Sequence, residues 1–381
     1  MRQPLITITL LFILYSSIGQ NTIENSSEFV FKGKIVGQNS GFVHLSYTSS
    51  SGKYIHDSVY LSNGEFEFKG FISEPTNSYF YGKRKSRSVD DPNSTDIYLE
   101  PANIYAIFKV DSLKTGKITG SKSQQEFDLY NQQYRNLENK WAPIYLSLKE
   151  ARTKNDTVRI DQIYSDEYPK INAQSDSLSF SFIKEYPNSF VSAMLLQYQT
   201  FKISNDSLKL IYARLSTTVK ESQRGKYINE FIKKAESLKI GKIAPGFTEL
   251  DLKNQKISLA DFRGKYVFLD FWASYCSPCR AEHPYLKQLY SKFHNKGFEI
   301  IEISLDNLDK KEDWLEAIKN DALPWLQICD FKGWAGEIVN TYNLYGKGIP
   351  SNFLINPQGL IIGKDLHEEA LTKKLSELIL Q

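Results

Sequence analysis

The stretch 270-DFWASYCSPCRAEHP-284 places Cys276 and Cys279 two residues apart. An apolar run over residues 266–271, typical of a buried strand, precedes the pair, and a helical pattern over residues 276–293 begins at it. Cys276 is therefore expected at a helix N-terminus, where free N–H groups and the helix dipole favour a thiolate. Cys279 follows one turn later on the same face, where it can resolve a mixed disulfide. The pattern predicts redox exchange.

Two other uses of the pair fit less well. A tetrahedral zinc site needs four ligands; Cys329 could be a third and His283 a fourth, but Cys329 has no close partner and His283 is on the same predicted helix as the pair. An inert disulfide would close a loop of four residues, and its stabilising effect grows with loop length. We therefore expect no metal and no cofactor beyond the redox-active disulfide, with Cys329 as a buried small hydrophobe.

Several motifs accompany the cysteine pair: Phe271-Trp272-Ala273, Cys276-Ser277-Pro278-Cys279, Arg280-Ala281-Glu282, Pro284, the segment 330-DFKGW-334, and Gly348-Ile349-Pro350 before a strand. These motifs resemble the thioredoxin fold, and more narrowly the TlpA/ResA-like exported thiol–disulfide oxidoreductases. The resemblance covers residues 241–381 and implies an α/β thioredoxin-like domain. The accessory β-rich and helical regions of Bacteroidetes-type relatives resemble the preceding residues.

The resemblance implies a role for each residue of the site. Cys276 is the nucleophile and Cys279 the resolving thiol. The two residues between them tune the reduction potential. A cis-proline loop binds the substrate chain through the backbone, and a tryptophan shields the disulfide. These further residues are Ser277 and Pro278 for tuning, and Trp272, Ile349 and Pro350 for substrate binding.

Acidic residues near the pair are candidates for proton handling. Asp270 interrupts an apolar strand, so a buried carboxylate there would relay a proton to Cys279; the alternative is an acid at the solvent edge of the sheet. Glu282 either helps to set the thiol pKa values or is an exposed helix residue. Thioredoxins often carry a lysine where this chain has Glu302. If Asp270 and Glu302 are buried together, one of them should stay protonated near neutral pH.

Length and composition predict several soluble domains. The chain has 381 residues, 24% of them charged, and a net charge of +3, which gives no reason to expect nucleic acid as a partner. We expect a signal peptide at 1–19, a β-rich accessory domain resembling a β-sandwich at 20–122, a helical region at 123–240 and the thioredoxin-like domain at 241–381. Asn63-Gly64 and Pro101-Ala102-Asn103 predict hairpin turns in the β-rich part.

The first residues indicate export. A basic start, Met1-Arg2, is followed by an apolar run over residues 5–18 and by small residues before Gly19, as in a secretory signal. The run is too short for a typical spanning helix, although an uncleaved membrane anchor remains the alternative. We therefore expect a periplasmic or cell-envelope protein that acts on protein thiols and disulfides and receives electrons from a membrane donor.

The leading functional hypothesis is a reductase of protein disulfides. A disulfide oxidase or isomerase would use the same fold in another direction, and the reduction potential separates these activities. A thiol peroxidase usually has Pro and Thr before its cysteine, where this chain has Leu269 and Ala273. A different class is a binding or scaffold protein, in which residues 20–240 carry the specificity and the redox domain is ancillary.

Overall fold

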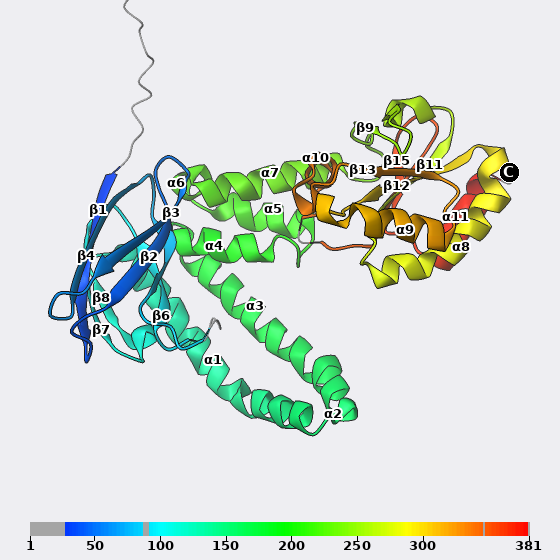
Figure 1. Ribbon diagram of the computed structural model, residues 1–381. Coiled ribbons are helices and arrows are strands. Elements are labelled where there is room, and N and C mark those ends of the chain that lie inside the picture. The colour runs from blue at the N-terminus through cyan, green and yellow to red at the C-terminus, as the bar shows by residue number, and fades with distance from the viewer. Residues whose placement is uncertain (1–26, 87–90, 346, 380–381) are drawn as a thin grey trace, which may run out of the picture. The chain divides into compact units, whose positions relative to one another are not determined.

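The computed structural model of the chain describes residues 27–86, 91–345 and 347–379 (Figure 1). The chain divides into two compact units, Met1–Leu129 and Tyr130–Gln381. The expected signal peptide at 1–19 lies outside the described residues, and the boundaries at 122/123 and 240/241 stay predictions. No helix among the described residues is both long enough and apolar enough to cross a membrane.

The first unit contains a β-sandwich, as the alternating pattern predicted. One sheet has the strand order β4-β1-β7-β8 and the other the order β3-β2-β5-β6. The strands are β1 (Ser27–Val36), β2 (Phe42–Thr48), β3 (Tyr54–Tyr60), β4 (Glu65–Ile72), β5 (Thr76–Tyr81), β6 (Ser94–Leu99), β7 (Asn103–Lys109) and β8 (Lys117–Thr119).

Aromatic side chains fill the space between the two sheets. Phe31 of β1 meets Phe80 of β5 edge to face, with ring centroids 5.5 Å apart, and Phe80 stacks on Phe108 of β7 at 5.1 Å. All three rings are buried. Gly33 lies opposite Ala106 in the parallel β1–β7 pair, and a Cβ atom at Gly33 would lie 2.1 Å from the Ala106 carbonyl oxygen. The close approach of these strands therefore requires glycine.

Both hairpin predictions are wrong, and for the same reason. The Asn63-Gly64 turn forms, with both residues at positive φ and a bridge between Ser62 and Glu65. However, β3 and β4 on either side of this turn belong to different sheets. The Pro101-Ala102-Asn103 segment likewise connects β6 of one sheet to β7 of the other. Each strand buries its apolar face against the opposite sheet, so these turns connect the layers instead of pairing neighbours.

Seven helices follow the sandwich, and α1 and α3 form a long antiparallel hairpin closed by α2 (Figure 1). Hydrogen bonds cross this hairpin from Trp141 to Gln174 at 3.1 Å and between Tyr130 and Ser179 at 3.1 Å. The helices are α1 (Lys122–Thr153), α2 (Thr157–Gln162), α3 (Tyr168–Glu185), α4 (Phe190–Gln199), α5 (Asn205–Arg214), α6 (Thr217–Glu221) and α7 (Gln223–Ser237).

The C-terminal part has the expected thioredoxin-like architecture around a five-stranded sheet. The strand order is β13-β12-β11-β14-β15, with β11, β12 and β13 parallel and β14 and β15 antiparallel to their neighbours. A small β9–β10 pair precedes the sheet. The strands are β9 (Thr248–Leu250), β10 (Lys256–Ser258), β11 (Tyr266–Trp272), β12 (Phe298–Ser304), β13 (Leu326–Cys329), β14 (Ser351–Ile355) and β15 (Ile361–Lys364).

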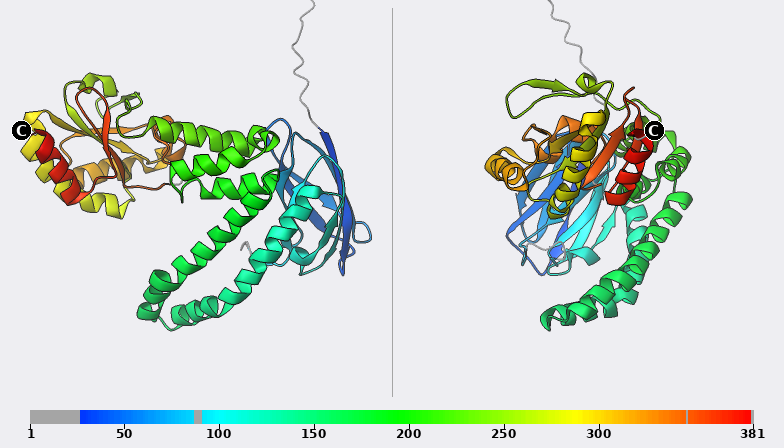
Figure 2. Two further views of the ribbon diagram at one scale, coloured as in Figure 1. Left: turned by 180° about the vertical axis from the view of Figure 1, so that it is seen from behind. Right: turned by 90° about the vertical axis from the view of Figure 1, so that its right-hand side faces the viewer.

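Helices cover both faces of this sheet. Helices α8 (Ser277–Phe293), α9 (Lys311–Asp321) and α11 (Glu368–Ile379) pack together on one face (Figure 2), and α10 (Glu337–Thr341) lies on the other. On the α10 side, Phe271 of β11 packs against Tyr342 and Phe353. Since side chains alternate along a strand, Asp270 and Trp272 face α8. This register places Asp270 between the sheet and the helix that carries the cysteines.

Candidate active site

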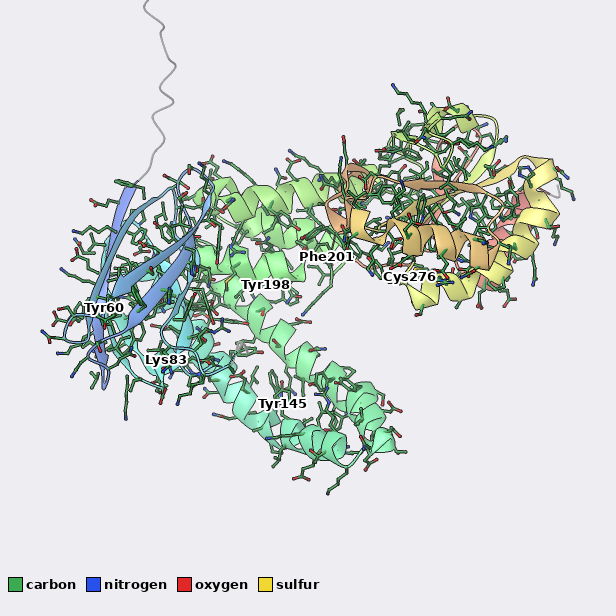
Figure 3. The ribbon with its side chains drawn as sticks, viewed as in Figure 1. Tyr60, Lys83, Tyr145, Tyr198, Phe201 and Cys276 are labelled. Atoms are coloured by element: carbon green, nitrogen blue, oxygen red, sulfur yellow. A yellow bond between two sulfur atoms is a disulfide. The ribbon has the colours of Figure 1, made fainter. Side chains whose placement is uncertain are left out.

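Cys276 and Cys279 form a disulfide at the N-terminus of α8, with their Cα atoms 5.3 Å apart (Figure 3). Cys276 is the N-cap residue, and its sulfur accepts a hydrogen bond from the backbone N–H of Cys279 at 3.3 Å. Pro278 lies in the first turn of α8. Backbone N–H groups in the first turn have no partner within the helix, so the helix loses no hydrogen bond by having proline there. The same N–H that now binds the sulfur would stabilise a thiolate on Cys276 after reduction.

Asp306, at the end of β12, holds the loop that leads to Cys276. Its carboxylate accepts hydrogen bonds from the backbone N–H of Ser274 at 2.9 Å and from the Ser274 hydroxyl at 2.6 Å. The hydroxyl of Ser304 donates to the same carboxylate at 2.6 Å, and Asp306 is fully buried. The sequence analysis missed this residue; an acid directly after a strand end was the available signal. Asp306 therefore fixes the approach of the chain to the disulfide.

The burial of Trp272 corrects the role that the sequence analysis expected for this residue. Its side chain is fully buried and packs edge to face on His283, with ring centroids 5.0 Å apart. A buried indole offers no surface to a substrate, so direct substrate binding by Trp272 is wrong. Tyr275, directly before Cys276, is 57% exposed and is the aromatic residue that a docking chain would meet. The sequence analysis overlooked Tyr275 although it adjoins the first cysteine.

The proline loop lies at the same end of the sheet as the disulfide. The Ile349–Pro350 peptide bond is cis, as expected. Strand β14 begins immediately afterwards and pairs antiparallel with β11, with Ser351 opposite Phe271. The start of β14 is therefore beside the end of β11 that leads to Cys276. Ile349 and Pro350 are both half-buried, which leaves part of the loop open to solvent.

Asp270 and Glu302 are buried side by side under α8. They occupy matching positions in the parallel β11–β12 pair, so both side chains point to the same face of the sheet. Burial is the main reason why the pKa of Asp270 lies well above its ordinary value, and the nearby charges of Glu302 and Glu282 add to the effect. Burial also raises the pKa of Glu302 to about 7, against a lowering effect of the hydrogen bond from Gln327. The solvent-edge position considered for Asp270 is wrong.

His283 connects this buried pair to a half-exposed ion pair. Its Nδ1 lies 2.8 Å from Asp321 Oδ2, and its Nε2 lies 3.4 Å from Glu302 Oε1. Asp321 in turn accepts two hydrogen bonds from the Arg280 guanidinium, at 2.9 and 2.8 Å. Burial lowers the pKa of His283, while Asp321 acts in the opposite direction. The sequence analysis treated His283 only as a possible metal ligand.

Glu282 binds a residue outside this chain of contacts. Its carboxylate oxygen Oε1 lies 2.8 Å from Nδ1 of His367, beyond β15. The side chain is half-buried, and burial raises its pKa. Its charge acts on Asp270, as noted above, so an influence on the thiols through Asp270 stays a prediction.

The structure also places the third cysteine, Cys329, and the side chains that could bind a metal. Cys329 ends β13, and its thiol donates to the Asp306 carbonyl at 3.5 Å. Burial raises the pKa of Cys329 to about 11. Over the described ranges 27–86, 91–345 and 347–379, no three His, Cys, Asp or Glu side chains are grouped in a way that could hold a metal ion.

Comparisons with protein families match both units of the chain. Residues 240–364 match the AhpC/TSA family, and residues 29–127 match a domain of unknown function, DUF4369. The thiol-disulfide oxidoreductase ResA of Bacillus cereus (strain ATCC 10987 / NRS 248) is 38% identical over 152 residues, which cover 39% of this chain and 82% of that protein. ResA of Bacillus thuringiensis subsp. konkukian (strain 97-27) gives the same identity and coverage.

A solved structure is similar to the same part of the chain. It is the thioredoxin domain of a thiol-disulfide oxidoreductase from Bacteroides vulgatus, which is 38% identical. The match covers 38% of this chain and 99% of that domain, with a TM-score of 0.35.

Proposed function

This chain belongs to the ResA-like thiol-disulfide oxidoreductases, and on that premise we propose that it is exported and reduces protein disulfides at Cys276 and Cys279. The observation that supports this proposal best is the disulfide at the start of α8, with the Cys276 sulfur bound by the Cys279 N–H. The same N–H and the helix dipole would stabilise the thiolate that attacks a substrate.

The first step would consume the thiolate of the reduced protein. The Cys276 thiolate attacks one sulfur of the substrate disulfide, forming a mixed disulfide and releasing the other substrate sulfur as a thiolate, which takes a proton from solvent. The exposed ring of Tyr275 and the backbone of Ile349 flank the approach and would position the incoming chain. Pro350 and the motif residues Ser277 and Pro278 would set the shape and potential of this site.

The second step would release the substrate. The Cys279 thiol gives its proton to the Asp270 carboxylate, and the Cys279 thiolate attacks the Cys276 sulfur of the mixed disulfide. The substrate's second sulfur leaves as a thiolate and is protonated, and the Cys276–Cys279 disulfide is restored. Two electrons pass from the protein dithiol to the substrate. A buried base suits this step because its raised pKa approaches that of the thiol it serves.

The cellular setting follows from the N-terminal segment and the family. A signal peptide over residues 1–19 would direct the protein to the periplasm or cell envelope. The oxidised protein needs a reductant for each cycle, for which we propose a membrane-bound thiol donor. No cofactor other than the Cys276–Cys279 disulfide enters this scheme.

The test compares two cysteine variants with a matched control. Cys276→Ser should abolish reduction of insulin disulfides, because it removes the thiol that attacks the substrate. Cys279→Ala should accumulate mixed disulfides with substrate proteins, which can then be identified by mass spectrometry. Cys329→Ser should behave as the wild type, since the raised pKa of this thiol keeps it protonated. Insulin reduction by Cys276→Ser at the wild-type rate would refute the assignment.

A further inference from the structure

The layer between α8 and the central sheet holds polar side chains that are buried without full hydrogen bonding. Within the described part of the chain, Asp270 Oδ1 and His283 Nε2 are buried and make no hydrogen bond. A buried polar atom without a partner costs about 1–3 kcal/mol, so such atoms are rarely grouped without a reason. His283 Nε2 lies 3.4 Å from Glu302 Oε1, and Asp270 is the register partner of Glu302, whose side chain is fully buried.

The contacts of His283 define which nitrogen carries its proton. Arg280 holds the Asp321 carboxylate ionised by two hydrogen bonds and lowers the pKa of that acid. The ionised carboxylate accepts the Nδ1–H of His283 at 2.8 Å. In the neutral ring, the lone pair is then on Nε2, which faces Glu302 Oε1 at 3.4 Å. A protonated Glu302 can donate to this nitrogen, and an ionised Glu302 can bind it after the ring is protonated.

Asp270 completes the row of groups. It is the register partner of Glu302 on the next strand, and neighbouring strands lie about 4.8 Å apart. Two carboxylates on the same face of neighbouring strands in a buried layer do not both stay ionised, so a proton on one favours ionisation of the other. The row therefore runs Asp270, Glu302, His283, Asp321, from the acid beneath the disulfide helix to a half-exposed ion pair with Arg280.

We propose that Glu302 and His283 are positioning residues that receive the Cys279 proton from Asp270 and pass it to Asp321 at the surface. This inference rests on the proposed function, because it assigns an exit to the proton that Asp270 takes up in the second step. The proposal assigns two further residues to the exchange reaction. It also gives the proton a route to solvent that does not pass back through the Cys279 thiol.

The transfer balances without any added reactant. When Asp270 has taken up the Cys279 proton, both acids of the pair are protonated. Glu302 gives its proton to Nε2 of His283, and Asp270 then gives its proton to the Glu302 carboxylate that this leaves. The imidazolium releases its Nδ1 proton to the Asp321 carboxylate, which gives it to solvent, and the ring is left neutral with its proton on Nε2. Asp270 is then ionised and Glu302 protonated, as they were before the second step.

The charged groups around the row determine the ionisation of its two ends. Helix α8 contributes Arg280, which keeps Asp321 ionised, and Lys287, whose ammonium binds the Asp321 carbonyl at 2.7 Å. Helix α8 also contributes Glu282, whose charge disfavours ionisation of Asp270. Strand β13 contributes the uncharged amide of Gln327, which donates to Glu302 at 2.5 Å. The Asp321 end is therefore an ionised carboxylate that can accept a proton, whereas the protonated form is favoured at the Asp270 end.

The experiment follows the two chemical steps separately in the full-length protein. The reduced protein is mixed with dithionitrobenzoate, a disulfide that releases a coloured thiolate at each step. Attack by Cys276 gives the first release, and attack by Cys279 on the mixed disulfide gives the second. Both rates are measured between pH 5.5 and pH 9 in a Cys329→Ser background, so that the third thiol adds no colour. Wild-type protein that gives no second release would refute the proposed function itself.

The variant Glu302→Gln tests the exit route with little change of shape. The Gln oxygen can keep the bond from Gln327, and its amide can donate to His283 as a protonated acid would, but it cannot transfer a proton. We expect the second release to slow by about tenfold at pH 7, within the range seen for coupled neighbours, and to lose the wild-type pH dependence. The first release should stay within about twofold, because it uses only the Cys276 thiolate.

Two further variants decide between a proton route and a structural role. His283→Gln should slow the second release in the same way, and the double variant should be no slower than either single variant if both act in one route. Glu299→Gln is the matched control, because Glu299 is on the same strand but binds Tyr290 and Lys265. Equal second-release profiles for the wild type, Glu302→Gln and Glu299→Gln would overturn the proposal. An equal slowing of both releases in Glu302→Gln would also overturn it.

Discussion

Replacing Glu302 by Gln should stabilise the protein at neutral and alkaline pH. Glu302 is a buried carboxyl group whose pKa is raised to about 7, mainly by burial, whereas an exposed glutamate has a value near 4.5. The folded state therefore holds its proton more tightly than the unfolded state does. An acid of this kind contributes most to stability below pH 4.5, and that contribution is lost as the pH rises through about 7.

The size of the effect follows from the two pKa values. Each pH unit between them corresponds to about 1.4 kcal/mol, so a rise from 4.5 to about 7 is equivalent to about 3 kcal/mol of unfolding free energy at most. Gln carries no ionisable proton and keeps the shape of the side chain. The difference in unfolding free energy, variant minus wild type, should therefore grow by about 2 kcal/mol between pH 5 and pH 8 and level off above.

Urea unfolding of the oxidised proteins measures this difference. Four of the five tryptophans lie after residue 241, so intrinsic fluorescence mainly reports on the thioredoxin-like part. His283 titrates in the opposite sense, since its lowered pKa makes stability rise with pH. Because His283 contacts Glu302, the comparison is made in a His283→Gln background, where this titration is absent from both proteins. A difference that stays constant from pH 5 to pH 8 would refute the assignment of a raised pKa to Glu302.

Three other predictions test the core, the loop and the third thiol. Gly33→Ala should destabilise the sandwich by about 1–3 kcal/mol in urea unfolding, because the new Cβ would clash with the Ala106 carbonyl oxygen. Asp306→Ala should destabilise the thioredoxin-like part by about 1–3 kcal/mol and slow exchange, since the N–H of Ser274 loses its buried acceptor. Cys329 should react slowly with iodoacetamide at pH 8. Its pKa is about 11, so only about one thousandth of the Cys329 side chains are in the reactive thiolate form at that pH.

Matched controls are available for the first two of these variants. Gly82→Ala adds the same methyl group in the same unit, where the nearest atom would be 3.9 Å away, and should leave stability within about 0.5 kcal/mol. Asp309→Ala removes an exposed acid from the turn after Asp306 and should change neither stability nor exchange. If Gly82→Ala destabilised the protein as much as Gly33→Ala, the proposed clash would be wrong. If Asp309→Ala had the same effect as Asp306→Ala, the proposed support of the loop would be wrong. Fast alkylation of Cys329 in the intact protein, at the rate of an ordinary free thiol, would contradict its raised pKa.

Local patterns predicted the thioredoxin-like part well because each signal had a local cause. The apolar run over residues 266–271 is typical of a strand buried on both faces, and Pro278 after Cys276 suited the first turn of a helix. The hairpins in the sandwich were predicted wrongly for the opposite reason. A turn sequence specifies the reversal of the chain but not the sheet that the next strand joins, and burial of opposite faces decided that.

The sequence by itself determined the chemistry of the site: the cysteine pair, the strand before it, the helix that begins at it and the proline loop downstream. Only the tertiary structure decided how that chemistry is served. Glu302 is 32 residues from Asp270 along the chain but beside it across the sheet, and His283 bridges from Glu302 to Asp321. These groups acquire their properties from burial and from one another. Desolvation and the distance between charges exist only after the strands and α8 have packed.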